Sequence, residues 1–304
     1  MTEVISASAV ARRNYWIDEI VRLSGNFGAD STRVQEELTD EISESGYPAI
    51  LDHLRLCGAI PESYGHDSSE EKLYSKYTDA LLSCAYNFIG LTSAVFTERA
   101  DAADVEAATD AYSFVADAKV FRLSRTAKNQ KDFKVQAMDG WKRGRPFAMV
   151  VCPLYQLPSR SSQIYQQAAS RNVCIFSYSH LSVLVNFAAS EDSVSAMHLL
   201  NTIFDTVAAM NPSKDAIAYW QAVNRCMLSY HAAIPDLWRL EKIANAESLV
   251  SAKEHALQVL ATERDSILRM SKDDAIARLI TDRRIESRIA TISSISENAL
   301  LDAS

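Results

Sequence analysis

The chain has 304 residues, of which 48% are hydrophobic and 23% are charged, and its formal net charge is −8. This composition excludes a wholly disordered chain, and the length is sufficient for one large domain or two modest ones. Because no uninterrupted apolar stretch reaches about 18 residues, we expect no membrane-spanning helix.

The cysteines and the first residues bear on the cellular compartment. The five cysteines form no C-x-x-C pair and no zinc-type spacing, a pattern typical of reduced, buried thiols. Residues 1–24 carry acidic and basic side chains and lack the apolar segment of a secretory signal. We therefore expect a cytoplasmic protein.

Helical periodicity dominates the first part of the chain. Between about residues 6 and 57, apolar side chains recur at helical spacing, first at Tyr15, Trp16, Ile20, Val21 and Leu23 and then at Leu38, Ile42, Ile50, Leu51 and Leu54. This pattern predicts helices that cover the core or a dimer surface. A further helix is expected to begin at Ser68. Glu71 follows three residues later, and this pair has the pattern of a capping box.

A short apolar stretch, Val115 to Phe121, predicts a β-strand. Side chains two apart on a strand point the same way, so Asp117 and Lys119 are expected on one face. A carboxylate could hold a hard cation there, and an ammonium could stabilise charge on an attacked phosphate. A D-x-K pattern is common, however, and most examples are surface ion pairs.

Positive charge follows this strand at once. The segment Lys119 to Arg145 contains nine Lys or Arg residues and two acids, in a chain whose net charge is −8. An acidic protein that gathers its positive charge beside one carboxylate–lysine pair has the distribution expected of a polyanion-binding site.

The second half of the chain predicts a mixed sheet followed by helices. Phe147–Cys152 and Val173–Phe176 read as buried strands joined through a helix, an order that indicates a parallel pair. We expect an α/β (α+β) fold with a mixed sheet of about five strands flanked by helices. Residues 1–192 would form the core with an N-terminal helical cap, and the helical region 193–304 would pack on that core to give one compact domain. The later helices are expected at Ser193–Met210, Lys214–Ala232, Leu237–Met270 and Asp273–Ile292.

Other common catalytic motifs are missing from the sequence. The six histidines show no metal-binding spacing, which disfavours a His-metal nuclease. The chain also contains no G-x-x-x-x-G-K-[ST] and no G-x-G-x-x-G motif, so neither an ATP-driven motor nor a dinucleotide enzyme is indicated.

The strand and its basic continuation, Val115 to Val135, closely resemble the core of the HindIII family of type II restriction endonucleases, which belongs to the PD-(D/E)xK nuclease superfamily. The resemblance spans roughly residues 55–190 and is most specific over Phe121–Val135. Further segments that carry it are Gly58–Glu62, Glu71–Lys76, Arg99–Val105, Pro153–Pro158, Ser162–Tyr165 and Asn172–Ser177.

The resemblance implies a restriction-endonuclease-like fold and a first catalytic acid ahead of Asp117. In that family this acid follows a glycine, whereas Ala103 stands here. Asp104 is our choice for the acid, Asp101 is its rival, and Asp110 is a more distant candidate. A hairpin between Asp104 and Asp117 would bring both carboxylates to one point.

The resemblance also implies a Mg²⁺ site and roles around it. Asp104, Asp117 and the backbone carbonyl of Ala118 would bind the ion, which would lower the pKa of a bound water. Lys119 would position or deprotonate that water. Many superfamily members carry an acid on a helix before the core. Glu71 therefore has two possible roles: a capping residue, or an outer carboxylate of the catalytic site.

DNA contacts are expected in the basic run. An asparagine can bond bidentately to adenine, and an aspartate can accept from cytosine, so Asn129 and Asp132 are candidates for base contact; the alternative is a helix cap or a solvated charge. The remaining predicted contacts are phosphate contacts from Arg122, Arg125, Lys128 and Lys131.

At the level of function, the resemblance implies site-specific cleavage of double-stranded DNA, at the palindrome AAGCTT after the first A, in a bacterial restriction-modification system. A companion DNA methyltransferase would protect the host. A palindrome and one active site per chain favour a two-fold homodimer. The alternatives are a non-cleaving DNA-binding protein on the same fold and a structure-selective nuclease.

Overall fold

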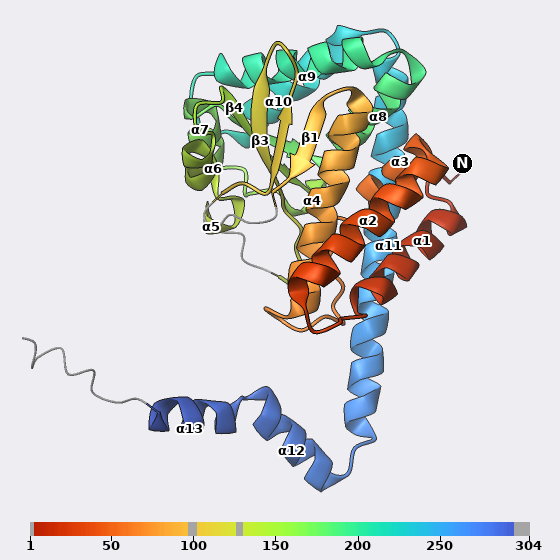
Figure 1. Ribbon diagram of the computed structural model, residues 1–304, viewed down its shortest axis with the longest axis vertical. Coiled ribbons are helices and arrows are strands. Elements are labelled where there is room, and N and C mark those ends of the chain that lie inside the picture. Colours follow the sequence, from red (N-terminus) through yellow and green to blue (C-terminus); the bar gives the residue numbers. More distant parts are fainter. Residues whose placement is uncertain (1–2, 97–101, 126–129, 295–304) are drawn as a thin grey trace, which may run out of the picture. The chain divides into compact units, whose positions relative to one another are not determined.

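A five-stranded mixed sheet forms the centre of the computed structural model, which describes residues 3–96, 102–125 and 130–294, with the backbone alone for residues 130–131. The strands are β1 (Thr92–Val95), β2 (Val105–Ala108), β3 (Ser113–Ala118), β4 (Phe147–Cys152) and β5 (Val173–Ser177). They lie in the order β1-β2-β3-β4-β5 (Figure 1). β1 to β3 are antiparallel and β3 to β5 are parallel. The predicted α/β class and mixed sheet are thus confirmed.

The predicted strand 115–121 is too long at its end, because the chain changes partner after Ala118. Lys119 N–H still donates to the Val151 carbonyl of β4 (2.7 Å), but Phe121 forms an isolated parallel bridge with Ala59. The Ile60 N–H donates to the Phe121 carbonyl (3.2 Å). This turn away from the sheet leaves the Asp117–Lys119 segment at the strand end.

Strand β1 escapes sequence-based prediction because little in its four residues favours a strand. Its side chains are half-buried or exposed, so no apolar alternation is visible. The strand is instead held by its neighbours: it pairs with β2, and the Asn87 side chain bonds to the backbone of Ser93 through both Oδ1 and Nδ2 (2.8 and 3.1 Å).

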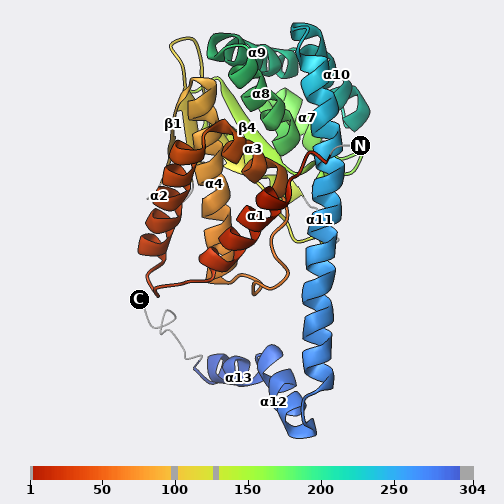
Figure 2. The same ribbon diagram turned by 90° about the vertical axis from the view of Figure 1, so that its right-hand side faces the viewer.

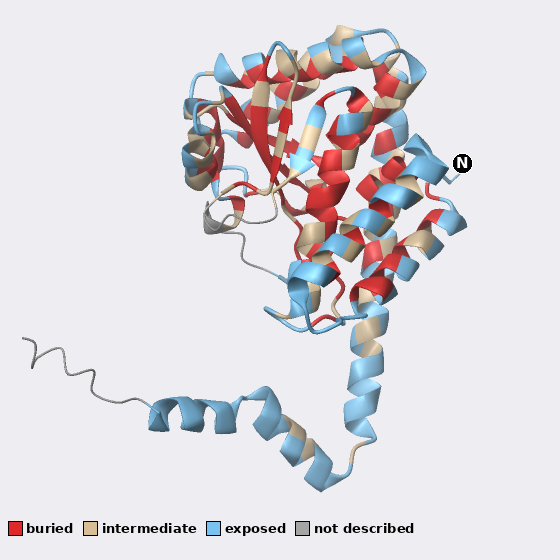
Figure 3. Ribbon diagram, in the orientation of Figure 1, coloured by how far each residue is buried: buried red, intermediate tan, exposed pale blue. Residues whose placement is uncertain are grey.

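Helices cover the sheet. The N-terminal ones are α1 (Ala7–Ile20), α2 (Phe27–Ser45), α3 (Tyr47–Leu56) and α4 (Ser69–Ile89); α5 (Gln130–Phe133), α6 (Val135–Trp141) and α7 (Gln163–Ser170) follow. A 3-10 turn spans Leu154–Gln156. Helix α4 packs on β1, β2 and β3. Strands β3 to β5 and the α4 face toward the sheet are largely buried, whereas β1 is exposed or half-buried (Figure 3). As expected, Ser68 caps α4 and accepts from the Glu71 N–H (3.2 Å).

The predicted crossover between the two buried strands is confirmed, because β4 and β5 are parallel and α7 connects them. The chain continues through α8 (Tyr178–Ser190), α9 (Ser193–Ala208), α10 (Ala216–Tyr230) and α11 (Ile234–Leu268). Pro235 lies in the first turn of α11, where its missing N–H costs nothing.

By its contacts the chain forms two units, Met1–Ala256 and Leu257–Ser304. Residues 193–256 therefore belong to the same unit as the sheet, although they contribute helices and no strand to it. In this unit the first part of α11 lies beside α3 and the N-terminal segment (Figure 2). Arg55 pairs with Glu241, and Glu247 Oε2 accepts from the N–H groups of Val4 and Ile5 (2.9 and 2.8 Å).

The second unit contains the end of α11, α12 (Lys272–Asp282) and α13 (Ile285–Ser293). The single helix expected over 273–292 is thus two helices, because Arg284 adopts a left-handed conformation (φ 50°) between them. Neither α12 nor α13 has a buried residue. Among the helices of the described ranges, none has the length and apolarity needed to cross a membrane.

A buried histidine makes the stability of the fold pH-dependent. His180 lies between Trp220 and Trp238, its Nε2–H donates to Asn224 Oδ1 (2.9 Å), and Nδ1 accepts from the Ser177 hydroxyl (2.5 Å). Burial lowers the pKa of His180 to about 4 from its ordinary 6.5, with the Asn224 bond opposing. The imidazole is therefore neutral in the folded protein at neutral pH.

We predict that this histidine lowers the unfolding free energy as pH falls from 6.5 toward 4, by about 2–3 kcal/mol. Above pH 6.5 both states hold a neutral ring; below it the unfolded chain takes up the proton first. Urea unfolding at pH 7, 5.5 and 4.5 measures the effect against His180→Gln, which retains the other titrating groups. Equal pH dependence of both proteins would contradict it.

Candidate active site

The β2–β3 hairpin brings Asp104 and Asp117 together. Val105 pairs with Ala116 in this antiparallel ladder, and extending the register by one residue sets Asp104 opposite Asp117. A tight turn closes the hairpin, where the Thr109 N–H donates to the Tyr112 carbonyl (2.8 Å) and the Thr109 hydroxyl accepts from the N–H groups of Ala111 and Tyr112 (3.1 and 3.2 Å). The two acids thus converge although they are 13 positions apart in the chain.

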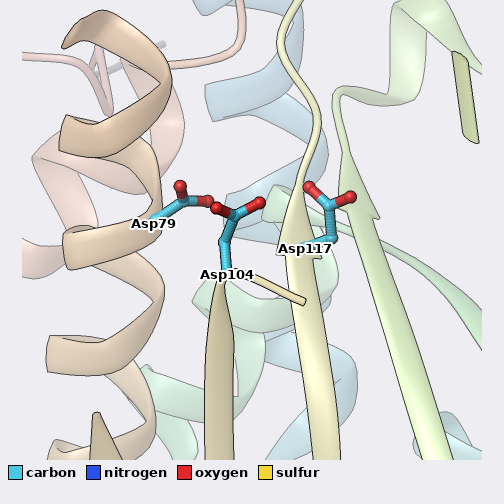
Figure 4. A group of neighbouring side chains, drawn as sticks. All are labelled: Asp79, Asp104 and Asp117. Atoms are coloured by element: carbon cyan, nitrogen blue, oxygen red, sulfur yellow. The ribbon is translucent and has the colours of Figure 1, made fainter. Parts of the chain in front are cut away.

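Helix α4 adds a third carboxylate, Asp79, which the sequence reasoning missed. One ligand oxygen from each of Asp79, Asp104 and Asp117 lies within 4.8 Å of the others. Figure 4 shows the three side chains directed toward one another from α4, from the start of β2 and from β3. The available signal was an acid inside the apolar helical run Tyr77–Leu82, a place where an unpaired charge is costly.

Two lysines neutralise part of this charge. Lys119 Nζ lies 2.5 Å from Asp117 Oδ2. Lys76 Nζ, one turn before Asp79 on α4, lies 2.5 Å from Asp104 Oδ1 and 3.4 Å from Asp79 Oδ2. The site is therefore a compact group of three acids and two ammonium groups.

The electrostatics of the group follow from its burial. Burial raises the pKa of the Asp79 carboxyl well above its usual range, and the nearby Asp104 and Asp117 carboxylates add to the rise. Burial alone would lower the pKa of Lys76, but the adjacent Asp79 and Asp104 outweigh it, so the net shift is upward. Lys76 is thus held as a cation.

The donor set fits a hard divalent cation. Carboxylate oxygens are the ligands that Mg²⁺ and Ca²⁺ prefer, and an ion with ligand distances of about 2.0–2.1 Å joins oxygens up to about 4.2 Å apart. Small side-chain rotations would close the observed spacing, within 4.8 Å, to that limit. Asp79, Asp104 and Asp117 could therefore hold Mg²⁺, and Ala118, whose carbonyl was predicted as a further ligand, lines the same pocket.

An open pocket of about 370 Å³ gives access to these acids. Its lining also includes Phe27 at the start of α2, Lys72 on α4 and Lys134 before α6. Lys134 has a left-handed backbone (φ 47°), uncommon for a residue with a side chain, and its ammonium lies over the Trp141 ring at 5.3 Å. The N-terminal helical part thus reaches the candidate site.

Glu71 lies elsewhere than this group of acids. Its Oε2 accepts from the Asp67 N–H (2.9 Å) and pairs with Arg122 at 3.2 Å. Of the two readings of Glu71, the structure displays the contacts of a capping residue, and the additional carboxylate from this helix is Asp79.

Arg122 has internal partners. Its guanidinium donates to the carbonyls of Tyr64 (2.7 Å) and Gly65 (2.8 Å) and pairs with Glu71. The side chain is 14% exposed. Its role in DNA binding stays a prediction, and the observed contacts indicate that it fixes the loop before α4.

Replacing Arg122 by methionine is expected to reduce the unfolding free energy by about 2–3 kcal/mol, because charged hydrogen bonds to half-buried partners are lost. Arg125→Met is the matched control. Its ion pair with Asp132 (2.6 Å) is more exposed, so a loss of at most about 1 kcal/mol is expected. Urea denaturation compares the two, and equal losses would contradict the structural role.

The other predicted residues are placed as follows. Arg125 lies over the Phe121 ring at 5.3 Å, and Asp110 is exposed in the hairpin turn. Asp101, Lys128, Asn129 and the side chain of Lys131 lie outside the described residues. Base and phosphate contacts in the basic run therefore stay predictions.

Comparison with known proteins identifies the family of this chain. A profile of the HindIII restriction endonuclease family matches residues 13–296. The chain is 30% identical over 259 residues to the type II restriction enzyme HindIII of Haemophilus influenzae, a match that covers 81% of this chain and 83% of the relative. The chain therefore belongs to the HindIII restriction endonuclease family, and it is a restriction endonuclease.

Proposed function

We propose that this protein hydrolyses phosphodiesters of double-stranded DNA with Mg²⁺, leaving 5′-phosphomonoesters. The observation that carries the proposal is the meeting of Asp79, Asp104 and Asp117 beside Lys119 in one open pocket. When bound there, Mg²⁺ would neutralise the scissile phosphate and lower the pKa of the attacking water.

The residues of the chain have distinct proposed roles in this reaction. Asp104, Asp117 and the Ala118 carbonyl would hold the ion. Asp79 would supply a further negative charge beside the ion, the role considered for Glu71 as an outer carboxylate. Lys119, held by Asp117 at 2.5 Å, would orient or deprotonate the water and stabilise the charge that develops on the phosphate.

Recognition is proposed for the palindrome AAGCTT, cut after the first A to leave a 5′ overhang. The extent of the match to the HindIII relative supports this site. Arg125, Lys128 and Lys131 would follow the phosphates, with Asn129 and Asp132 near the bases. The Asp132–Arg125 ion pair would have to open for Asp132 to reach a base.

A two-fold homodimer is proposed, because a palindrome offers each strand to one of two identical sites. A companion DNA methyltransferase would protect the host genome in the bacterial cytoplasm. Analytical ultracentrifugation of the purified protein with a short AAGCTT duplex tests the stoichiometry. Two chains per duplex is the expected result, and one chain would contradict the dimer.

A plasmid with a single AAGCTT site tests the proposed activity. With Mg²⁺ we expect one linear product whose ends map after the first A, and with EDTA intact plasmid. No cutting under both conditions would favour the non-cleaving DNA-binding protein. Diffuse cutting, or cutting of branched substrates alone, would favour a structure-selective nuclease. A matched plasmid that carries AAGGTT at the site is the control.

A further inference from the structure

The side chain of Lys76 occupies a special position among the three acids. Its ammonium donates to Asp104 Oδ1 (2.5 Å) and lies 3.4 Å from Asp79 Oδ2. It thus makes contact with two of the three carboxylates that would hold a divalent ion. Lys119, by contrast, contacts the third carboxylate, Asp117, and is 12% exposed.

These contacts reduce the repulsion between the carboxylates of the metal-free site. Three carboxylates with oxygens within 4.8 Å of one another repel when they are ionised. Asp79 is 2% exposed, so solvent screens it poorly. A cation between Asp79 and Asp104 relieves the repulsion, and in the described residues Lys76 supplies that cation from the same helix as Asp79.

A lysine ammonium and a divalent ion compete for the same carboxylate oxygens. Asp104 Oδ1 is already taken by the Lys76 ammonium at hydrogen-bond distance. An ion that draws Asp104 and Asp79 to its own short ligand distances would be close to Nζ, and two cations at such a separation repel.

We propose that Lys76 is the internal counter-ion of the metal site: it neutralises Asp79 and Asp104 in the metal-free enzyme, and a divalent cation binds by displacing its ammonium. This rests on the proposed function, because it requires that the acids bind such an ion. The side chain of Lys76 is 28% exposed and lines the open pocket, and its flexible stem allows the ammonium to move aside.

Displacement has a measurable consequence. The apparent affinity for the ion is reduced by the free energy of the Lys76 contacts, because these must break first. Removing the ammonium should therefore tighten metal binding, opposite to the effect of removing a ligand. It should also leave the metal-free protein less stable, because the acids then lack their counter-ion.

Calorimetric titration of Mg²⁺ without DNA tests the proposal on wild type, Lys76→Met and Lys72→Met. Lys72 is the matched control: it lies one turn earlier on α4 and lines the same pocket, and it forms no ion pair with a carboxylate of the described ranges. We expect Lys76→Met to bind Mg²⁺ about tenfold more tightly, the scale of one partly screened ion pair. Lys72→Met should change the affinity by about twofold at most.

Equal or weaker binding by Lys76→Met would overturn the counter-ion role. Absence of Mg²⁺ binding in all three proteins would instead overturn the metal site itself, so the two failures are distinguishable. Thermal denaturation provides a second measurement with Lys76→Gln, which retains a polar side chain. Its metal-free melting temperature should be lower than that of wild type, and the rise caused by Mg²⁺ should be larger; an equal rise would contradict displacement.

Discussion

Replacing Lys119 by alanine is expected to lower the rate of DNA cleavage by at least about 10³-fold while specific binding is retained. Groups that transfer a proton or stabilise developing charge contribute on the order of 10²–10⁴-fold each. The position of Lys119 favours the stabilisation of developing charge, because Asp117 fixes its ammonium at the pocket. Single-turnover cleavage of an AAGCTT duplex measures the rate, and binding is measured separately with Ca²⁺ in place of Mg²⁺.

The fold should tolerate this change. The Lys119 backbone N–H keeps its bond to the Val151 carbonyl, so the end of β3 stays attached to β4. Lys253→Ala, at an exposed lysine of α11, is the matched control and should cut at the wild-type rate. A Lys119→Ala protein that cleaves within about tenfold of wild type would remove Lys119 from the catalytic assignment.

Asp117→Asn is expected to have an effect at least as large. The amide keeps the size of the side chain and removes the negative charge that lies within 4.8 Å of Asp79 and Asp104 and pairs with Lys119. Both the hold on the ion and the orientation of the lysine are lost, so cleavage should fall by at least about 10³-fold. Raising Mg²⁺ should restore little of the rate, because the lysine stays unoriented.

Asp110→Asn separates this effect from a general loss of negative charge. Asp110 belongs to the same hairpin but is exposed in its turn, and its replacement should leave the rate unchanged. Calorimetric titration of Mg²⁺ into both variants gives a second readout. Strong metal binding and cleavage by Asp117→Asn would contradict the assignment of Asp117 as a metal ligand.

The parts of the fold that the sequence predicted are those with strong local signals. Phe147–Cys152 and Val173–Ser177 are fully buried strands, and their continuous apolar runs predict buried strands. The convergence of Asp104 and Asp117 could be predicted because a hairpin of this length places its ends opposite each other. β1 could not, because its strand conformation depends on pairing with β2 and on the Asn87 side chain.

The candidate site exposes a different limit of sequence reasoning. Asp79 lies in an apolar helical run, so its position beside two other acids depends on how α4 packs against the hairpin, which no local pattern reports. Arg122 looks like a member of a phosphate-binding run, but it donates to the Tyr64 and Gly65 carbonyls. Charge counted along the chain does not reveal which cations have internal partners.

The most direct test of the account is to locate a divalent ion among the three acids. Crystals soaked in Mn²⁺ and measured at the manganese absorption edge should show an anomalous peak roughly 2.0–2.6 Å from oxygens of Asp104 and Asp117, the range for oxygen ligands of hard divalent cations. Asp79 should border the peak, and the Lys76 ammonium should have left Asp104. The absence of a peak at saturating Mn²⁺, with Lys76 still on Asp104, would contradict the account.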